Sequence, residues 1–131
     1  MKSFLKTAVS SVALTAFSTT VAMAECTNER WNAVMERGTL IVGVKADYKP
    51  GGLGDEGGNI VGMEIDMAAD VARAMGVELE LVAVQSSNRM QFLEQGKIDL
   101  MIATMSDRAD RREIVGIVGP NYYTSGTNIM S

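Results

Sequence analysis

Three short apolar runs, each followed by polar residues, dominate the middle of the sequence. They are TLIVGVK (residues 39–45), VELELVAV (77–84) and IDLMIA (98–103). Runs of this length are typical of buried strands, and strands apolar on both faces are typical of a parallel sheet. Helical patterns lie between them, over residues 64–75 and 87–95. This alternation predicts an α/β fold in which helices flank a mostly parallel sheet.

The remaining segments complete this expected layout. Residues 27–37 predict an amphipathic helix capped by Thr27 or Asn28, and Ser86 or Ser87 is the expected cap of the helix at 87–95. Residues 47–61 contain a proline and five glycines and predict a loop. Their glycine spacing fits neither phosphate-binding motif, G-x-G-x-x-G or G-x-x-x-x-G-K-[ST]. The run IVGIV, residues 114–118, predicts a fourth strand.

The first 24 residues have the plan of a secretory signal peptide. Two lysines precede an apolar segment that ends in Ala22-Met23-Ala24, a small-residue cleavage pattern. The apolar segment is short and rich in Ser and Thr for a membrane anchor. We therefore expect cleavage after Ala24 and a periplasmic protein. Cys26 lies one residue too late for a lipoprotein cysteine, so we predict no lipid anchor there.

Composition narrows the possible functions. Removing the signal peptide, which has two lysines and no acid, takes the net charge from −4 to −6. An acidic domain does not suit nucleic acid. The chain has one cysteine and no histidine, so an intrachain disulfide is impossible, and a zinc site or histidine-based triad has no ligands or base. We predict no metal, no cofactor, no catalytic residue and a monomer.

The sequence KIDLMIATMSDRADRRE (residues 97–113) is the candidate functional segment. It predicts a strand, a hydroxyl turn with Thr104 and Ser106, and a basic helix. Such a turn offers hydroxyls and free N–H groups to an anion, and an arginine adds a fork suited to a carboxylate. Spacing alone does not choose among Arg108, Arg111 and Arg112, and surface arginines are often only solvated. Ligands of open α/β sheets bind at the carboxyl ends of strands, here 45–48, 85–87 and 104–106.

Several segments of the sequence, taken together, resemble a known family. The segments GTLIVGVK, DYKP, GNIVGMEIDMAADVARAMG, NRMQFLEQGKIDLMIATMSDRADRRE and NYY occur in the order and spacing of bacterial extracellular solute-binding proteins of family 3. These are the periplasmic amino-acid receptors of ABC importers. The resemblance covers nearly all of residues 27–124 and corresponds to the N-terminal half. It implies a periplasmic-binding-protein type II-like lobe at residues 25–131, truncated before the second lobe.

The resemblance also implies roles for single residues. Arg111 matches the arginine that binds the ligand's α-carboxylate, and Thr104 and Ser106 match the turn that binds carboxylate and α-ammonium. Tyr48 matches an aromatic wall, and Lys45 and Ser86 match positions lining the side-chain pocket. The alternatives are that Tyr48 only covers the sheet end, that Lys45 faces solvent and that Arg111 is a surface charge. Gly51 departs from the family, which often has an aromatic residue there.

The expected function is that of the amino-acid-binding component of an ABC importer, whose partner is a membrane permease. Because a second lobe normally completes the site, we expect this chain alone to bind amino acids very weakly or not at all. Two alternatives share the fold: a dehydratase acting on arogenate or a related cyclohexadienyl substrate, and a sensor input domain. The dehydratase needs a general acid or base. The carboxylates near strand ends are Asp47, Glu64 and Asp99, for which structural roles are simpler.

Overall fold

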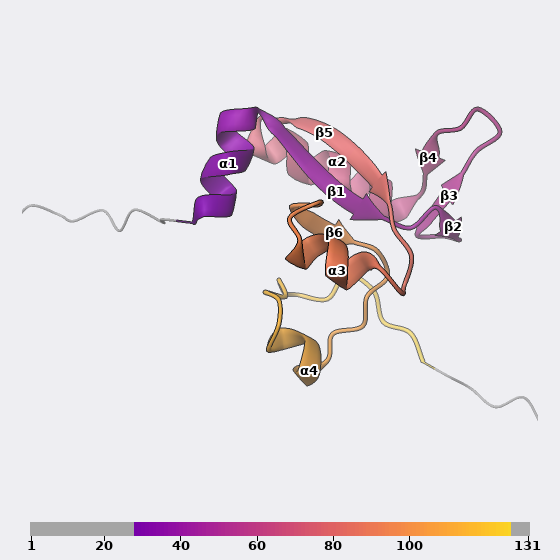
Figure 1. The fold of residues 1–131 in the computed structure, drawn as a ribbon. Coiled ribbons are helices and arrows are strands. Elements are labelled where there is room, and N and C mark those ends of the chain that lie inside the picture. Colours follow the sequence, from indigo (N-terminus) through magenta and orange to yellow (C-terminus); the bar gives the residue numbers. More distant parts are fainter. Residues whose placement is uncertain (1–27, 127–131) are drawn as a thin grey trace, which may run out of the picture.

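The computed structural model describes residues 28–126, so the predicted signal peptide and Cys26 lie outside the described residues. Three parallel strands form the central sheet (Figure 1). They are β1 (Thr39–Val44), β5 (Glu78–Ala83) and β6 (Leu100–Ile102). The sheet order is β5-β1-β6, with Thr39 opposite Glu78 and Val42 opposite Leu100. The predicted α/β fold with a parallel sheet is confirmed.

Strand β1 is buried on both faces because helices cover both sides of the sheet. On one face Leu40, Val42 and Val44 pack with Ala68 and Ala72 of helix α2 (Met63–Met75). On the other face Ile41 belongs to a cluster with Ile98 and Phe92, the latter from helix α3 (Arg89–Glu94). Figure 1 shows α2 and α3 on opposite sides of the sheet. Burial on both faces explains the near-continuous apolar sequence of this strand.

The predicted helices form with shifted starts. Helix α1 (Glu29–Arg37) is capped by Asn28, one of the two expected caps, whose side chain accepts from the backbone N–H of Arg30 at 3.1 Å. The cap predicted for α3 was wrong, because the helix begins at Arg89, after both serines. The Asn88 side chain instead accepts from the backbone N–H of Gln85, at 2.9 Å. This contact closes a turn before the helix begins.

The segment predicted as a glycine-rich loop contains a small antiparallel sheet. Strand β3 (Gly52–Gly54) pairs with β2 (Asp47–Tyr48) on one side and β4 (Ile60–Val61) on the other. A side chain at Gly52 is impossible, because a Cβ there would lie 1.9 Å from the carbonyl oxygen of Lys45. Glycine therefore permits close packing of two backbones here rather than only flexibility.

The predicted fourth strand at residues 114–118 was also wrong. It follows the one-turn helix α4 (Ala109–Arg112), and the N–H groups of Ile114 and Val115 donate to the carbonyl oxygen of Arg111 at 3.1 and 3.0 Å. These N–H groups continue the turn and are not available to a strand partner. Val118 is 83% exposed. An apolar run forms a strand only where a neighbouring edge and two covered faces are present.

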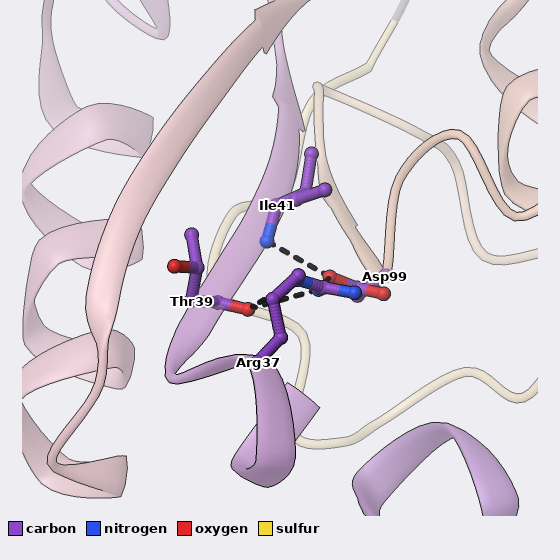
Figure 2. Close-up of polar contacts among 4 residues, drawn as sticks. All are labelled: Arg37, Thr39, Ile41 and Asp99. Carbon is purple, nitrogen blue, oxygen red and sulfur yellow. Dashed lines mark hydrogen bonds and ion pairs between the residues drawn. The ribbon is translucent and has the colours of Figure 1, made fainter. Parts of the chain in front are cut away.

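Asp99 joins the beginnings of two neighbouring strands (Figure 2). Its carboxylate accepts from the backbone N–H of Ile41 at 2.9 Å and pairs with the guanidinium of Arg37, which also donates to the carbonyl oxygen of Thr39. The backbone N–H of Asp99 donates to Ile41 at 2.8 Å. Asp99 therefore has the structural role expected for it, at the end of the sheet opposite the candidate site.

Candidate functional site

Two adjacent hollows lie beyond the carboxyl end of β6. Both are lined by Thr104, Tyr122 and Tyr123. The first continues along the turn through Met105, Ser106 and Asp107 and is closed by Asn121 and Ser125. The second is lined in addition by Tyr48, Pro50, Gly51, Met63 and Glu64. A site at this edge is where ligands of open α/β sheets bind.

Thr104, at the junction of the two hollows, has a strained backbone. Its φ angle is 51°, and it is the one non-glycine residue with positive φ among residues 28–126. This conformation is rare for a β-branched residue and costs on the order of 1–3 kcal/mol. Strained residues persist only where neighbouring contacts fix them. The contacts of Thr104 therefore identify what holds the turn.

Glu64 makes those contacts. Its Oε1 accepts from the backbone N–H of Thr104 at 2.6 Å and from the Thr104 hydroxyl at 2.7 Å. The Tyr122 hydroxyl also donates to Oε1, at 2.8 Å. Glu64 is 1% exposed, and Oε2 has no hydrogen-bond partner within residues 28–126. A buried carboxylate on helix α2 thus connects the hydroxyl turn with the C-terminal segment.

Tyr122 holds its phenolic proton more tightly than a solvated phenol does. Burial of the hydroxyl, together with the hydrogen bond to Glu64, raises the pKa of Tyr122 to about 12. The residue as a whole is 44% exposed, so the ring faces the hollows while its polar end points inward. Tyr122, which lines both hollows, is therefore fixed in place by its contact with the Glu64 carboxylate.

Arg111 lies against the same turn. Its Nη1 donates to the backbone carbonyl of Ser106 at 2.8 Å, and Arg111 is half-buried. Arg108 and Arg112 are exposed and pair with Asp110 and Asp107. No ion pair involves Arg111 within the described part of the chain. Of the three arginines, Arg111 is thus the one placed at the turn with its charge not neutralised by a contacting carboxylate.

Arg89 is a second cation near the turn. It is 7% exposed, and its Nη1 donates to the carbonyl oxygen of Ala103. Burial lowers the pKa of the Arg89 guanidinium, the positive charge of Arg111 lowers it further, and the negative charge of Glu64 acts in the opposite direction. These mutual effects place Arg89, Arg111 and Glu64 within electrostatic range of one another.

Of the remaining predicted site residues, only Tyr48 lines a hollow. Tyr48 lines the second hollow and is 48% exposed. Lys45 does not face solvent: its side chain is 9% exposed and its Nζ lies 2.8 Å from Asp47 Oδ1. Ser86 is exposed, and neither it nor Lys45 lines a hollow. Arg111 also lies outside the lining of both hollows and borders the first one only through its contact with Ser106. Helix α4 has four residues, so the positive charge near this turn comes from the arginine side chains rather than from a helix dipole.

Sequence reasoning missed Glu64, Tyr122 and Arg89 as site residues. Glu64 was detectable, because it is four residues before Ala68 and eight before Ala72, on the buried stripe of α2. An acid in register with a buried apolar stripe needs a polar partner. Tyr122 and Arg89 had no such signal, since both reach the turn through tertiary contacts.

Comparison with known proteins identifies the family of the chain. The family described as bacterial extracellular solute-binding proteins, family 3, matches residues 40–131. The chain belongs to this family. It is 30% identical to the arginine-binding extracellular protein ArtP of Bacillus subtilis and 36% identical to a glutamine-binding protein of Geobacillus stearothermophilus. These alignments cover 90% and 74% of the chain but 46% and 38% of those relatives. The chain thus spans less than half the length of each.

A solved structure gives the same fold. The arginine-bound form of domain 1 from TmArgBP, the protein of T. maritima, is 38% identical with a TM-score of 0.64. The match covers 67% of this chain and 70% of that one. Enzymes also match: a cyclohexadienyl dehydratase of Pseudomonas aeruginosa is 29% identical over 63% of the chain. Family 3 membership therefore establishes the fold and relates the chain to solute-binding proteins.

Two further properties concern the described residues alone. Between residues 28 and 126, no helix is long and apolar enough to cross a membrane. The same residues contain no group of three or more His, Cys, Asp or Glu side chains placed to hold a metal ion.

Proposed function

We propose that residues 25–131 form the first lobe of a periplasmic amino-acid receptor that serves an ABC importer. In this proposal residues 1–24 direct export and are removed, a second lobe completes the site, and a membrane permease receives the solute. The relatives that carry the proposal are named for binding arginine and glutamine. The chain covers less than half of each of those proteins.

The observation that supports the proposal most strongly is the position of Arg111. Its guanidinium contacts the turn that carries Thr104 and Ser106, next to a hollow at the carboxyl edge of the sheet. A planar fork not neutralised by a contacting acid suits a carboxylate. We assign the α-carboxylate of an amino acid to Arg111 and Ser106, with Thr104 as a polar partner of the α-ammonium and Tyr48 as an apolar wall.

Lys45 and Ser86 are proposed as more distant members of the same site. Neither lines a hollow of this lobe, so we expect them to contribute only where a second lobe adds to the cavity. Lys45 is already paired with Asp47. Its charge is therefore partly neutralised and supplies only a weak preference for acidic side chains.

The test is calorimetry and NMR titration of residues 25–131 with arginine, glutamine and glutamate. One lobe leaves a zwitterion half solvated, where each charged contact is weak. We expect a dissociation constant in the millimolar range, about −4 kcal/mol. The arginine-bound domain 1 of TmArgBP is a precedent, for that protein, of a first lobe holding its ligand. Because Arg111 lies at the turn with its remaining N–H groups free of carboxylate partners among residues 28–126, we narrow the expectation from weak or no binding to weak binding. No saturable change with any amino acid at millimolar concentration therefore contradicts the assignment, and micromolar affinity contradicts the need for a second lobe.

A dehydratase remains the second candidate, because a cyclohexadienyl dehydratase matches and the buried carboxylate of Glu64 borders the second hollow. Glu64 is a poor general acid or base, since Oε1 already accepts three hydrogen bonds. Incubation with prephenate and arogenate separates the two functions. Release of phenylpyruvate or phenylalanine, lost in a Glu64→Gln variant, favours the enzyme.

A further inference from the structure

Glu64 controls which hydrogen bonds Thr104 is able to offer. A threonine presents two protons, one on its backbone nitrogen and one on its hydroxyl. The hydroxyl donates to Oε1 of Glu64 at 2.7 Å, and the backbone N–H donates to the same oxygen at 2.6 Å and, more weakly, to the Tyr122 hydroxyl at 3.3 Å. With its proton committed, the hydroxyl retains only lone pairs for a molecule in the hollows. Thr104 therefore acts toward a ligand as an acceptor and not as a donor.

The second carboxylate oxygen strengthens this preference. Oε2 is buried, carries no hydrogen bond within residues 28–126 and lies beside Gly51. A Cβ at Gly51 would lie 3.0 Å from Oε2 and 3.2 Å from the Thr104 hydroxyl. Gly51 therefore packs closely against both groups, and a side chain there would crowd them. A negative charge directly behind an acceptor hydroxyl attracts a cation in a low-dielectric setting.

We propose that Glu64 is a positioning residue for amino-acid binding, which fixes the Thr104 hydroxyl as an acceptor for the ligand's ammonium group. The inference rests on the proposed function, which supplies the positions of the two ends of the ligand, and what it adds is the role of Glu64. The ammonium lies at Thr104, beside Glu64, and the carboxylate lies at Ser106 and Arg111. Glu64 acts through Thr104 and its charge, without touching the ligand.

The first experiment is an NMR titration of residues 25–131 with arginine and with the arginine analogue that lacks the α-ammonium. Glu64→Gln keeps the side-chain shape, and Asp66→Asn is the matched control, because Asp66 is exposed on the same helix and its loss changes the net charge equally. We expect Glu64→Gln to weaken arginine binding about tenfold, as for loss of a hydrogen bond to a charged group. Binding of the analogue and of arginine to Asp66→Asn should stay unchanged.

A double-mutant cycle separates positioning from a general structural role. Thr104→Val removes the hydroxyl and keeps the branched shape. If Glu64 acts through that hydroxyl, Glu64→Gln costs little further affinity in the Thr104→Val background. A fully additive loss, or equal losses for arginine and its analogue, overturns the inference. Thr104→Ser keeps a hydroxyl and should restore the preference for arginine.

The amide proton chemical shift of Thr104, measured without ligand, tests the inference even if a variant binds poorly because its folding has changed. The short bond from the Thr104 N–H to a carboxylate predicts a downfield amide proton resonance for Thr104, which moves upfield in Glu64→Gln and stays in Asp66→Asn. An unmoved Thr104 resonance overturns the inference even if the receptor assignment stands. If wild type shows no saturable shift with arginine or glutamine, the proposed function fails, and the inference fails with it.

Discussion

The guanidinium of Arg111 donates to the carbonyl oxygen of Ser106, 2.8 Å away, and so lies along the turn that ends the central sheet. The contact uses one N–H of a group that has five. The others remain for a ligand. We expect Arg111→Lys to lower amino-acid affinity between about ten- and a hundredfold, because lysine cannot make the bidentate contact.

Arg108→Lys is the matched control for Arg111, since Arg108 is exposed and already paired with Asp110. Titration with arginine or glutamine, followed by NMR, measures both variants. Equal losses for Arg108→Lys and Arg111→Lys would remove the carboxylate assignment, because the loss would then not depend on which arginine is replaced.

Replacing Asp99 by alanine should destabilise the fold. The substitution leaves the backbone N–H of Ile41 and the guanidinium of Arg37 without their shared acceptor. The side chain is 12% exposed, and we expect the free energy of unfolding to fall by about 1–3 kcal/mol. Urea denaturation gives the value. Asp70→Ala breaks an exposed pair with Arg73 and should cost less than about 0.5 kcal/mol.

Substitution of Gly62 tests the close approach between its backbone and that of Gly51. Its φ angle is 143°, and a Cβ there would lie 2.4 Å from the carbonyl oxygen of Gly51. We expect Gly62→Ala to destabilise the protein by about 2 kcal/mol or more, because alanine disfavours this φ and must displace the backbone beside Glu64. In contrast, a Cβ at Gly116 meets nothing within 4 Å, so Gly116→Ala should unfold at nearly the same urea concentration as wild type.

Tyr122 should titrate near pH 12. Its pKa is raised above the ordinary value of 10.0, so the folded state holds the phenolic proton more tightly than the unfolded state does. The contribution to stability is therefore present below pH 10 and is lost as the pH rises toward 12. Ultraviolet absorbance of tyrosinate should show a step near pH 12 that disappears in Tyr122→Phe. Persistence of that step in the variant would assign it to another group.

Much of the fold followed from local pattern. The apolar runs that became β1, β5 and β6 and the stripe of α2 were readable because burial on two faces leaves long apolar stretches and burial on one helix face leaves a repeat. The apolar run at residues 114–118 led to the wrong prediction of a strand because it has the same local pattern. Apolarity marks a segment that gains by burial, but pairing needs an available edge. Here Ile114 and Val115 instead continue the turn of α4.

Much of the candidate site also came from the sequence, through the ordered family motifs that singled out Arg111, Thr104 and Ser106 before any contact was known. Tertiary structure alone decided what holds these groups. Glu64, on α2, is 40 residues from Thr104 in the sequence and 58 from Tyr122. Arg89, at the start of α3, donates to the carbonyl oxygen of Ala103, 14 residues away. A hydrogen bond between distant segments depends on how helices and strands pack in space. The sequence by itself therefore determined the layers and the polar edge of the sheet, whereas packing decided which carboxylate lies beneath it.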